Sequence, residues 1–158
     1  MLGFAMRTLS SQVRYAICGI FDLAYNADYE PVQLRVIGER QGIPPRYLEQ
    51  IFQRLRRAGL VAGKRGPGGG YTLARGTSEI TLRDVVEGVE GPFDEADDSD
   101  DRAPSSAGDC PCGPDFLWPS IAERFAAMLA ETTIEDLCQE SAKRGIKRAS
   151  AEYLTYQI

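Results

Sequence analysis

Apolar residues recur at helical spacing over residues 44–58, directly before a glycine-rich turn. Pro44 and Pro45 open this stretch, and the missing backbone N–H of proline is tolerated in the first turn of a helix. The apolar positions that form one helical face are Leu48, Ile51, Phe52 and Leu55. The residues on or beside the opposite face are Arg46, Gln50, Arg54 and Arg57. We therefore predict a helix with one apolar and one basic face, which ends at Gly59.

The segment after this helix, residues 63–70, has the sequence GKRGPGGG and lies between two short extended runs at 60–62 and 71–73. Glycines next to a proline allow the positive φ angles of a hairpin tip and let the backbone approach another molecule closely. Lys64 and Arg65 place positive charge at this tip. A phosphate-binding P-loop would need Gly-Lys-Ser/Thr at the start of a helix, whereas a strand is predicted here.

The preceding residues complete a helix-turn-helix pattern. Residues 9–24 are predicted to form a first helix, with Ser10 or Ser11 as its cap and Cys18 as a small core residue. Its expected buried stripe consists of Val13, Ile17, Ile20, Phe21 and Ala24. A second helix at 34–41 should end at Gly42. The predicted fold is therefore mainly α with a small β-hairpin wing, a winged helix-turn-helix whose third helix would enter the major groove.

The second half of the chain contains an acidic segment and a long apolar helix. A capping box at Thr81 and Asp84 should start a helix that runs to Gly91, and residues 93–109 are acidic and expected to be mobile. A capping box at 132–135 should start the last helix, which carries Cys138. The helix between them is predicted to be a long dimerisation helix, with a stripe that packs on a second copy: Trp118, Ile121, Phe125, Met128 and Leu129.

These elements suggest four regions: 6–91 as the DNA-binding domain, 92–114 as an acidic loop with a cysteine-containing sensor loop, 115–142 as the dimerisation and C-terminal helices, and 143–158 as a basic tail. The net charge of −5 does not exclude DNA binding, because the charges are segregated. Residues 44–75 hold seven basic residues and one acid, whereas 91–109 hold seven acids and one arginine. Salt screens such separated charges beyond about 8 Å.

The composition excludes several kinds of chemistry. The chain has no histidine, which removes the commonest general base and metal ligand and makes an enzyme the weakest interpretation. No apolar run is long enough to span a bilayer and the first residues lack the order of a signal peptide, so we expect a cytoplasmic protein without a membrane partner. The four cysteines then suggest metal or redox chemistry rather than a disulfide framework.

At this point the sequence resembles the Rrf-two (Rrf2) family of bacterial winged-helix regulators. The motifs that carry the resemblance are VRYA at 13–16, PRYLEQIF at 45–52, LRRAGLV at 55–61, RGPGGGYTLA at 65–74, ITLRDVVE at 80–87, and Trp118 with its helix. The resemblance runs from about Met6, where such proteins usually begin, to about Cys138. It implies a homodimeric transcription factor that binds a double-stranded DNA operator, most often as a repressor.

The resemblance also makes the segment before Trp118 a candidate sensor. Cluster-bearing members of the family place three cysteines there and add a fourth ligand that varies. This chain offers Cys110, Cys112 and Asp115 as candidate metal ligands for a 2Fe–2S cluster, and it lacks a counterpart of the first family cysteine. Cys138 or a group from the other subunit would have to complete the set. A thiol switch at Cys110 and Cys112, or a loop that has lost its sensor, remain alternatives.

The predicted DNA-binding residues lie on the third helix and the wing. They are Arg46, Tyr47, Gln50, Arg54 and Arg57 on the helix, and Lys64, Arg65, Gly68 and Gly69 in the wing. Arginine and glutamine can bind base edges with two hydrogen bonds, lysine and arginine neutralise phosphates, and glycines let the backbone approach. The alternative function is a cluster-free regulator of the CymR type, whose activity a partner protein controls.

Overall fold

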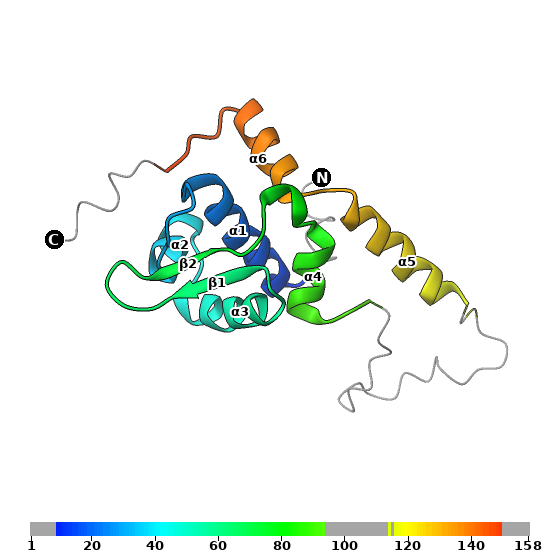
Figure 1. Ribbon diagram of the computed structural model, residues 1–158. Helices are drawn as coiled ribbons and strands as arrows, with labels where there is room; N and C mark the ends of the chain where they lie inside the picture. Colours follow the sequence, from blue (N-terminus) through cyan, green and yellow to red (C-terminus); the bar gives the residue numbers. More distant parts are fainter. Residues whose placement is uncertain (1–8, 94–113, 115, 150–158) are drawn as a thin grey trace.

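The computed structural model describes residues 9–93, 114 and 116–149 of the 158-residue chain. Figure 1 shows a bundle of short helices that carries a two-stranded hairpin on one side. The elements in chain order are α1 (Ser11–Asn26), α2 (Leu34–Gln41), α3 (Pro45–Arg57), β1 (Val61–Lys64), β2 (Gly70–Leu73), a 3-10 turn η2 (Thr77–Glu79), α4 (Leu82–Glu90), α5 (Leu117–Ala130) and α6 (Ile134–Lys143). The predicted winged helix-turn-helix is confirmed.

Helix α1 starts where the sequence predicts but turns a slightly different face to the core. The Ser10 hydroxyl caps it by accepting a hydrogen bond from the Val13 N–H at 3.2 Å. The buried apolar residues of α1 are Val13, Ala16, Ile20, Leu23 and Tyr25. The expected stripe was partly wrong, because Ile17, Phe21 and Ala24 are only half-buried. Cys18 is also half-buried, so it lies at the edge of the core and not inside it.

Helices α2 and α3 have the bounds that their sequence signals predict. Gly42 ends α2 in the left-handed conformation with φ of +66°, and its N–H bonds to the carbonyl of Gly38. Pro45 occupies the first turn of α3. The apolar face of α3 is completely covered, because the four predicted residues are at most 1% exposed: Leu48, Ile51, Phe52 and Leu55.

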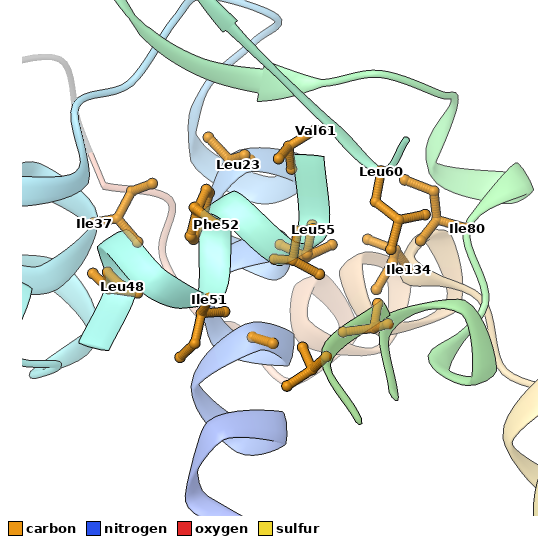
Figure 2. Packing of buried hydrophobic residues seen from close by; sticks show 14 of the residues in the cluster. Leu23, Ile37, Leu48, Ile51, Phe52, Leu55, Leu60, Val61, Ile80 and Ile134 are labelled. Carbon is orange, nitrogen blue, oxygen red and sulfur yellow. The ribbon is translucent and has the colours of Figure 1, made fainter. Parts of the chain in front are cut away.

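Figure 2 shows the core in which this face packs, where side chains from α1, α2, α3 and β1 meet Ile80 and Ile134. One charged residue is buried beside it. Asp22 is fully buried on α1 and accepts hydrogen bonds from Arg40 at 3.2 Å and Gln41 at 2.9 Å, at the end of α2. A buried carboxylate needs such partners, so this cluster fixes the position of α2 on α1.

The wing is an antiparallel hairpin in which Val61 pairs with Leu73 and Lys64 with Gly70. Val32 extends this pairing by one bridge, because it exchanges two backbone hydrogen bonds with Tyr71 at 2.8 and 2.9 Å. Gly70 allows this close approach: it has φ of +154°, and a Cβ there would lie 2.5 Å from the Val32 carbonyl. The wing is therefore anchored to the loop between α1 and α2.

After α5 the chain returns to residues 9–91, the predicted DNA-binding unit. The Ile134 N–H donates to the Ile80 carbonyl at 2.9 Å, the Ile134 side chain is fully buried, and α6 packs against α1. The capping box of α6 is Thr133 with Asp136, one residue later than we predicted. The proposed division of the chain stays a prediction, but its third region shares contacts with the first. No helix in the described part of the chain is long and apolar enough to cross a membrane.

Candidate nucleic-acid interface

The exposed face of α3 carries a continuous polar stripe. Its four residues follow one another at intervals of four, three and four positions, which places them on one side of a helix: Arg46, Gln50, Gln53 and Arg57. All four are exposed, and the stripe lies opposite the buried residues Leu48 and Leu55. The stripe has a cation at each end and two amides between them, which is suitable for contacts with phosphates and base edges.

Gln53 completes this stripe, although it is not among the predicted DNA-binding residues. The signal was available, because Gln53 lies three residues after Gln50 and seven after Arg46, which is the spacing of a single helical face. The amide side chain of Gln53 has the same donor and acceptor as that of Gln50. The stripe therefore offers two neighbouring amides for base-edge contacts instead of one.

Tyr47 lies on the flank of α3 that faces α1. Its ring is 6.1 Å from the Tyr15 ring, measured between centroids, and the residue is half-buried. The Arg46 guanidinium carbon lies 4.7 Å from the Tyr47 ring centroid, and Arg46 Nη2 donates to the Tyr47 hydroxyl at 2.8 Å. Tyr47 thus holds the Arg46 side chain in place at the first turn of the stripe.

Arg54 is exposed and lies beside the stripe, on the same flank as Tyr47. Its Nη1 donates to Gln12 Oε1 on α1 at 2.8 Å and to the carbonyl of Val89 on α4 at 3.2 Å. The other flank carries Arg56, which approaches β1 beside Gly63. Arg54 is therefore bound within its own chain in this structure.

The wing tip presents its two cations to solvent. Lys64 and Arg65 are exposed, and Gly68 has φ of +70° with open space on the side where a Cβ would stand. Gly69 differs from the expectation, because it is buried inside the tip: its N–H donates to the Gly66 carbonyl at 2.9 Å, and a Cβ would collide with the Lys64 carbonyl. Gly69 closes the turn, while Gly68 is free for a close approach.

Helix α5 exposes large apolar side chains. Trp118 is 57% exposed, Ile121 49% and Met128 54%. Two other residues of the predicted stripe have partners in their own chain: Leu129 belongs to the core, and the Phe125 ring meets the Phe93 ring edge-on at 5.9 Å between centroids. The expected stripe thus divides into a part that packs on the DNA-binding unit and a part that has no cover within the described residues.

The candidate metal ligands Cys110, Cys112 and Asp115 lie outside the described residues. Among the residues that the structure describes, no group of three or more cysteine, aspartate and glutamate residues could hold a metal ion. Cys138 lines a pocket of about 350 Å³ between α6, β2 and the end of α1. Burial raises the pKa of both described thiols, Cys18 and Cys138, so both favour the unreactive protonated form.

Comparison with known proteins agrees with this arrangement. The profile of the Rrf2 family, described as iron-dependent transcriptional regulators, matches residues 9–140. The chain is 40% identical over 129 residues to the HTH-type transcriptional regulator IscR of Klebsiella pneumoniae (strain 342), covering 82% of this chain and 78% of that protein.

Two solved structures have a similar fold over most of this chain. The structure of IscR from T. potens has a TM-score of 0.67 at 30% identity and covers 92% of this chain and 95% of that one. CymR, the global cysteine regulator of B. subtilis, has a TM-score of 0.64 at 31% identity, over 84% of this chain and 96% of the other.

The predicted resemblance and the expectation of a regulator rather than an enzyme are therefore confirmed by sequence and by structure. The matched residues include the α3 stripe, the wing, α5 and most of α6. The chain belongs to the Rrf2 family of winged-helix transcriptional regulators.

Proposed function

We propose that a homodimer of this protein binds a two-fold symmetric DNA operator, with α3 in the major groove and the wing on the adjacent backbone. The observation that carries this proposal is the stripe of Arg46, Gln50, Gln53 and Arg57, which is exposed on a helix whose other face is fully buried. A helix of this kind cannot change its exposed face without opening the core, so the stripe is available for a partner.

Each part of this surface has a role that follows from its chemistry. Gln50 and Gln53 contact base edges, because an amide pairs with adenine through two hydrogen bonds. Arg46 and Arg57 bracket the amides and contact guanine or phosphate. Lys64 and Arg65 neutralise backbone phosphates from the wing, and Gly68 lets the main chain come close to the sugar-phosphate backbone.

The uncovered apolar residues of α5 support the dimer. Trp118, Ile121 and Met128 lie along one side of α5 at intervals of three and seven residues. A solvated tryptophan with two aliphatic neighbours is typical of an interface core, and a second α5 offers the same surface in return. A dimer also brings two α3 stripes to two half-sites about one helical turn of DNA apart.

We further propose that Cys110 and Cys112 sense redox or iron status, which agrees with the similarity to IscR. Two thiolates and the Asp115 carboxylate give three donors, whereas a 2Fe–2S cluster takes four, so a fourth donor must come from elsewhere in the dimer. When bound, a cluster would supply a charged, oxidisable group at the segment before α5. The chain itself would supply three of the ligands, Cys110, Cys112 and Asp115, directly before helix α5.

The test of DNA binding is a selection from genomic fragments followed by affinity measurements at physiological salt. Operator affinity at least a thousandfold above that for random DNA is expected, since specific binding normally exceeds non-specific binding by that factor or more. Gln50→Ala should reduce the preference for the correct base at one base pair of each half-site by about ten- to a hundredfold, which is the usual discrimination of an amide–adenine pair. Binding that has no sequence preference in the wild type would disprove the proposal.

The test of sensing is separate. We expect anaerobically purified protein to contain iron and acid-labile sulfide in equal amounts, with both lost in Cys110→Ala and Cys112→Ala. If the protein were free of iron and still bound its operator, the proposal of a cluster would be wrong and the proposal of DNA binding would stand. This result would place sensing in thiol chemistry of these cysteines or in a partner protein.

A further inference from the structure

Arg54 connects three helices at one point of the DNA-binding unit. Its guanidinium Nη1 lies 2.8 Å from Gln12 Oε1 in the first turn of α1 and 3.2 Å from the Val89 carbonyl in the last turn of α4. The stripe residue Arg46, by contrast, donates to its neighbour Tyr47. Arg54 is therefore a residue through which the exposed side of α3 is bound to the rest of the unit.

The Val89 carbonyl gives this contact its physical basis. The last carbonyls of a helix have no donor within the helix, and they form the negative end of its dipole. Helix α4 has no basic residue in its own last turn. The Gly91 N–H satisfies the Glu87 carbonyl at 2.9 Å, whereas Val89 receives its donor from Arg54 on another helix. Arg54 thus caps α4 with a cation.

The capped end of α4 is also connected to α5. Phe93 follows the last turn of α4, and its ring meets Phe125 on α5 edge-on at 5.9 Å between centroids. Helices α4 and α5 pack against each other. Contacts and the chain itself therefore connect α5 to α3: Phe125 meets Phe93, the backbone joins Phe93 to the last turn of α4, and Arg54 binds the Val89 carbonyl there.

We propose that Arg54 is a positioning residue that couples the placement of α5 to the orientation of the recognition helix α3, and that it does not contact bases. This inference rests on the proposed function, because it assigns a role within operator binding. A shift of α5 moves the end of α4, and the shared hydrogen bond passes that movement to α3. Arg54 is exposed four residues after Gln50, on the flank toward α1, where its guanidinium is bound to Gln12 and to the Val89 carbonyl.

The first experiment separates positioning from contact with DNA. Affinities of Arg54→Ala are measured for the operator, for a set of single-base-pair variants of it, and for random DNA, each over a range of salt. We expect operator affinity to fall about three- to tenfold, the usual extent of such coupling, and by the same factor on every variant. Affinity for random DNA and the salt slope should stay unchanged, and Gln12→Ala should give the same pattern more weakly.

Two matched variants give the comparison. Gln50→Ala marks the behaviour of a base contact, which is a loss confined to one base pair. Lys64→Ala marks a phosphate contact, which weakens all DNA alike and lowers the salt slope by about one. An Arg54→Ala result that matches either pattern would overturn the proposal. If the wild type itself showed no sequence preference, the proposed function would be wrong. This outcome differs from either pattern in Arg54→Ala, so failure of this proposal can be told from failure of the proposed function.

The second experiment tests the connection to α5 with a double-mutant cycle between Phe93→Ala and Arg54→Ala. Operator affinity is measured at a concentration where sedimentation shows every variant to be a dimer. We expect Phe93→Ala to lower the binding free energy for the operator by half as much or less in the Arg54→Ala background as in the wild type. Both changes interrupt the same connection between α5 and α3. Additive effects would show that α5 does not act through Arg54. Thermal unfolding of each variant excludes a general loss of folding as the cause.

Discussion

Helices α3 and α5 are both amphipathic, but among the residues that the structure describes only α3 has its apolar face completely covered. The apolar face of α3 is at most 1% exposed, and its polar stripe is in solvent. Helix α5 buries Ala126 and Leu129, yet Trp118 remains 57% exposed. Burying an exposed apolar surface stabilises a complex, whereas burying charged side chains requires a charged partner. The difference agrees with the two partners that we propose, nucleic acid at α3 and a second copy of the chain at α5.

The largest expected effect comes from a charge on the uncovered side of α5. Ile121→Glu should convert the dimer to a monomer in sedimentation and lower operator affinity more than about a hundredfold, because two half-sites are then no longer bound together. Glu123→Ala, on the solvent side of the same helix, is the matched control and should leave the dimer and the operator affinity unchanged. If Ile121→Glu were still a dimer, the subunits would meet at another surface, and the exposed side of α5 would not be the protein interface that distinguishes it from α3.

A second effect tests how tightly the wing is fixed beside α3. Gly70→Ala should lower the free energy of unfolding by about 2 kcal/mol or more, because the new Cβ would collide with the Val32 carbonyl at a positive φ angle. Gly68→Ala meets no neighbouring atom and should cost only about 1 kcal/mol for its left-handed backbone. Urea unfolding measures both. Equal costs would mean that the wing is not anchored at Val32.

A smaller effect is expected at the wing tip. Lys64→Ala should weaken binding to operator and random DNA by the same factor and lower the slope of log affinity against log salt by about one, as one released counterion requires. Titrations at several salt concentrations would show this. A loss restricted to the operator would make Lys64 a base contact and extend the sequence-specific surface from α3 to the wing.

The smallest effect concerns α6, through which the chain returns from α5 to the core. Hydrogen bonds from the Thr133 backbone and hydroxyl lower the pKa of Asp136 below its ordinary value. This carboxylate therefore stabilises the fold at pH values above the ordinary aspartate pKa, and the contribution is lost as the pH falls through the lower folded pKa. Asp136→Ala should reduce the melting temperature slightly at about pH 7, and the difference from wild type should vanish in acid.

Glu135→Ala is the control for this prediction, since Glu135 shares the first turn of α6 but makes no capping-box bond. Glu135→Ala should lower the melting temperature less than Asp136→Ala does at about pH 7. A difference between Asp136→Ala and wild type that persists in acid well below the folded pKa of Asp136 would mean that the side chain acts by packing and not by its charge.

Much of the fold followed from local signals. Gly42, Pro45 and the Thr81–Asp84 capping box marked helix ends correctly, because each one satisfies or removes a backbone group at a fixed position. The buried face of α3 also followed from its periodicity. The predicted box at 132–135 failed by one residue, since two adjacent threonines offer two caps and the bridge between Thr81 and Thr133 selects the second.

The candidate site was predicted less completely. The basic stripe and the wing cations were predicted, whereas Gln53 and the contacts of Arg54 with α1 and α4 were not. Spacing alone gives the angle of a side chain around the helix; it does not show that a carbonyl of α4 lies within reach of Arg54. The predicted roles of the site residues in binding DNA stay predictions until they are measured.

The sequence by itself determined which helices form, where the hairpin turns and that positive charge gathers on one helix and the wing, because these depend on residues close together in the chain. Only the tertiary structure decided that Leu129 packs into the core while Ile121 stays exposed, and that Arg54 caps α4. Such outcomes depend on contacts between distant segments. Their free energies come from burial and hydrogen bonds that no local pattern contains.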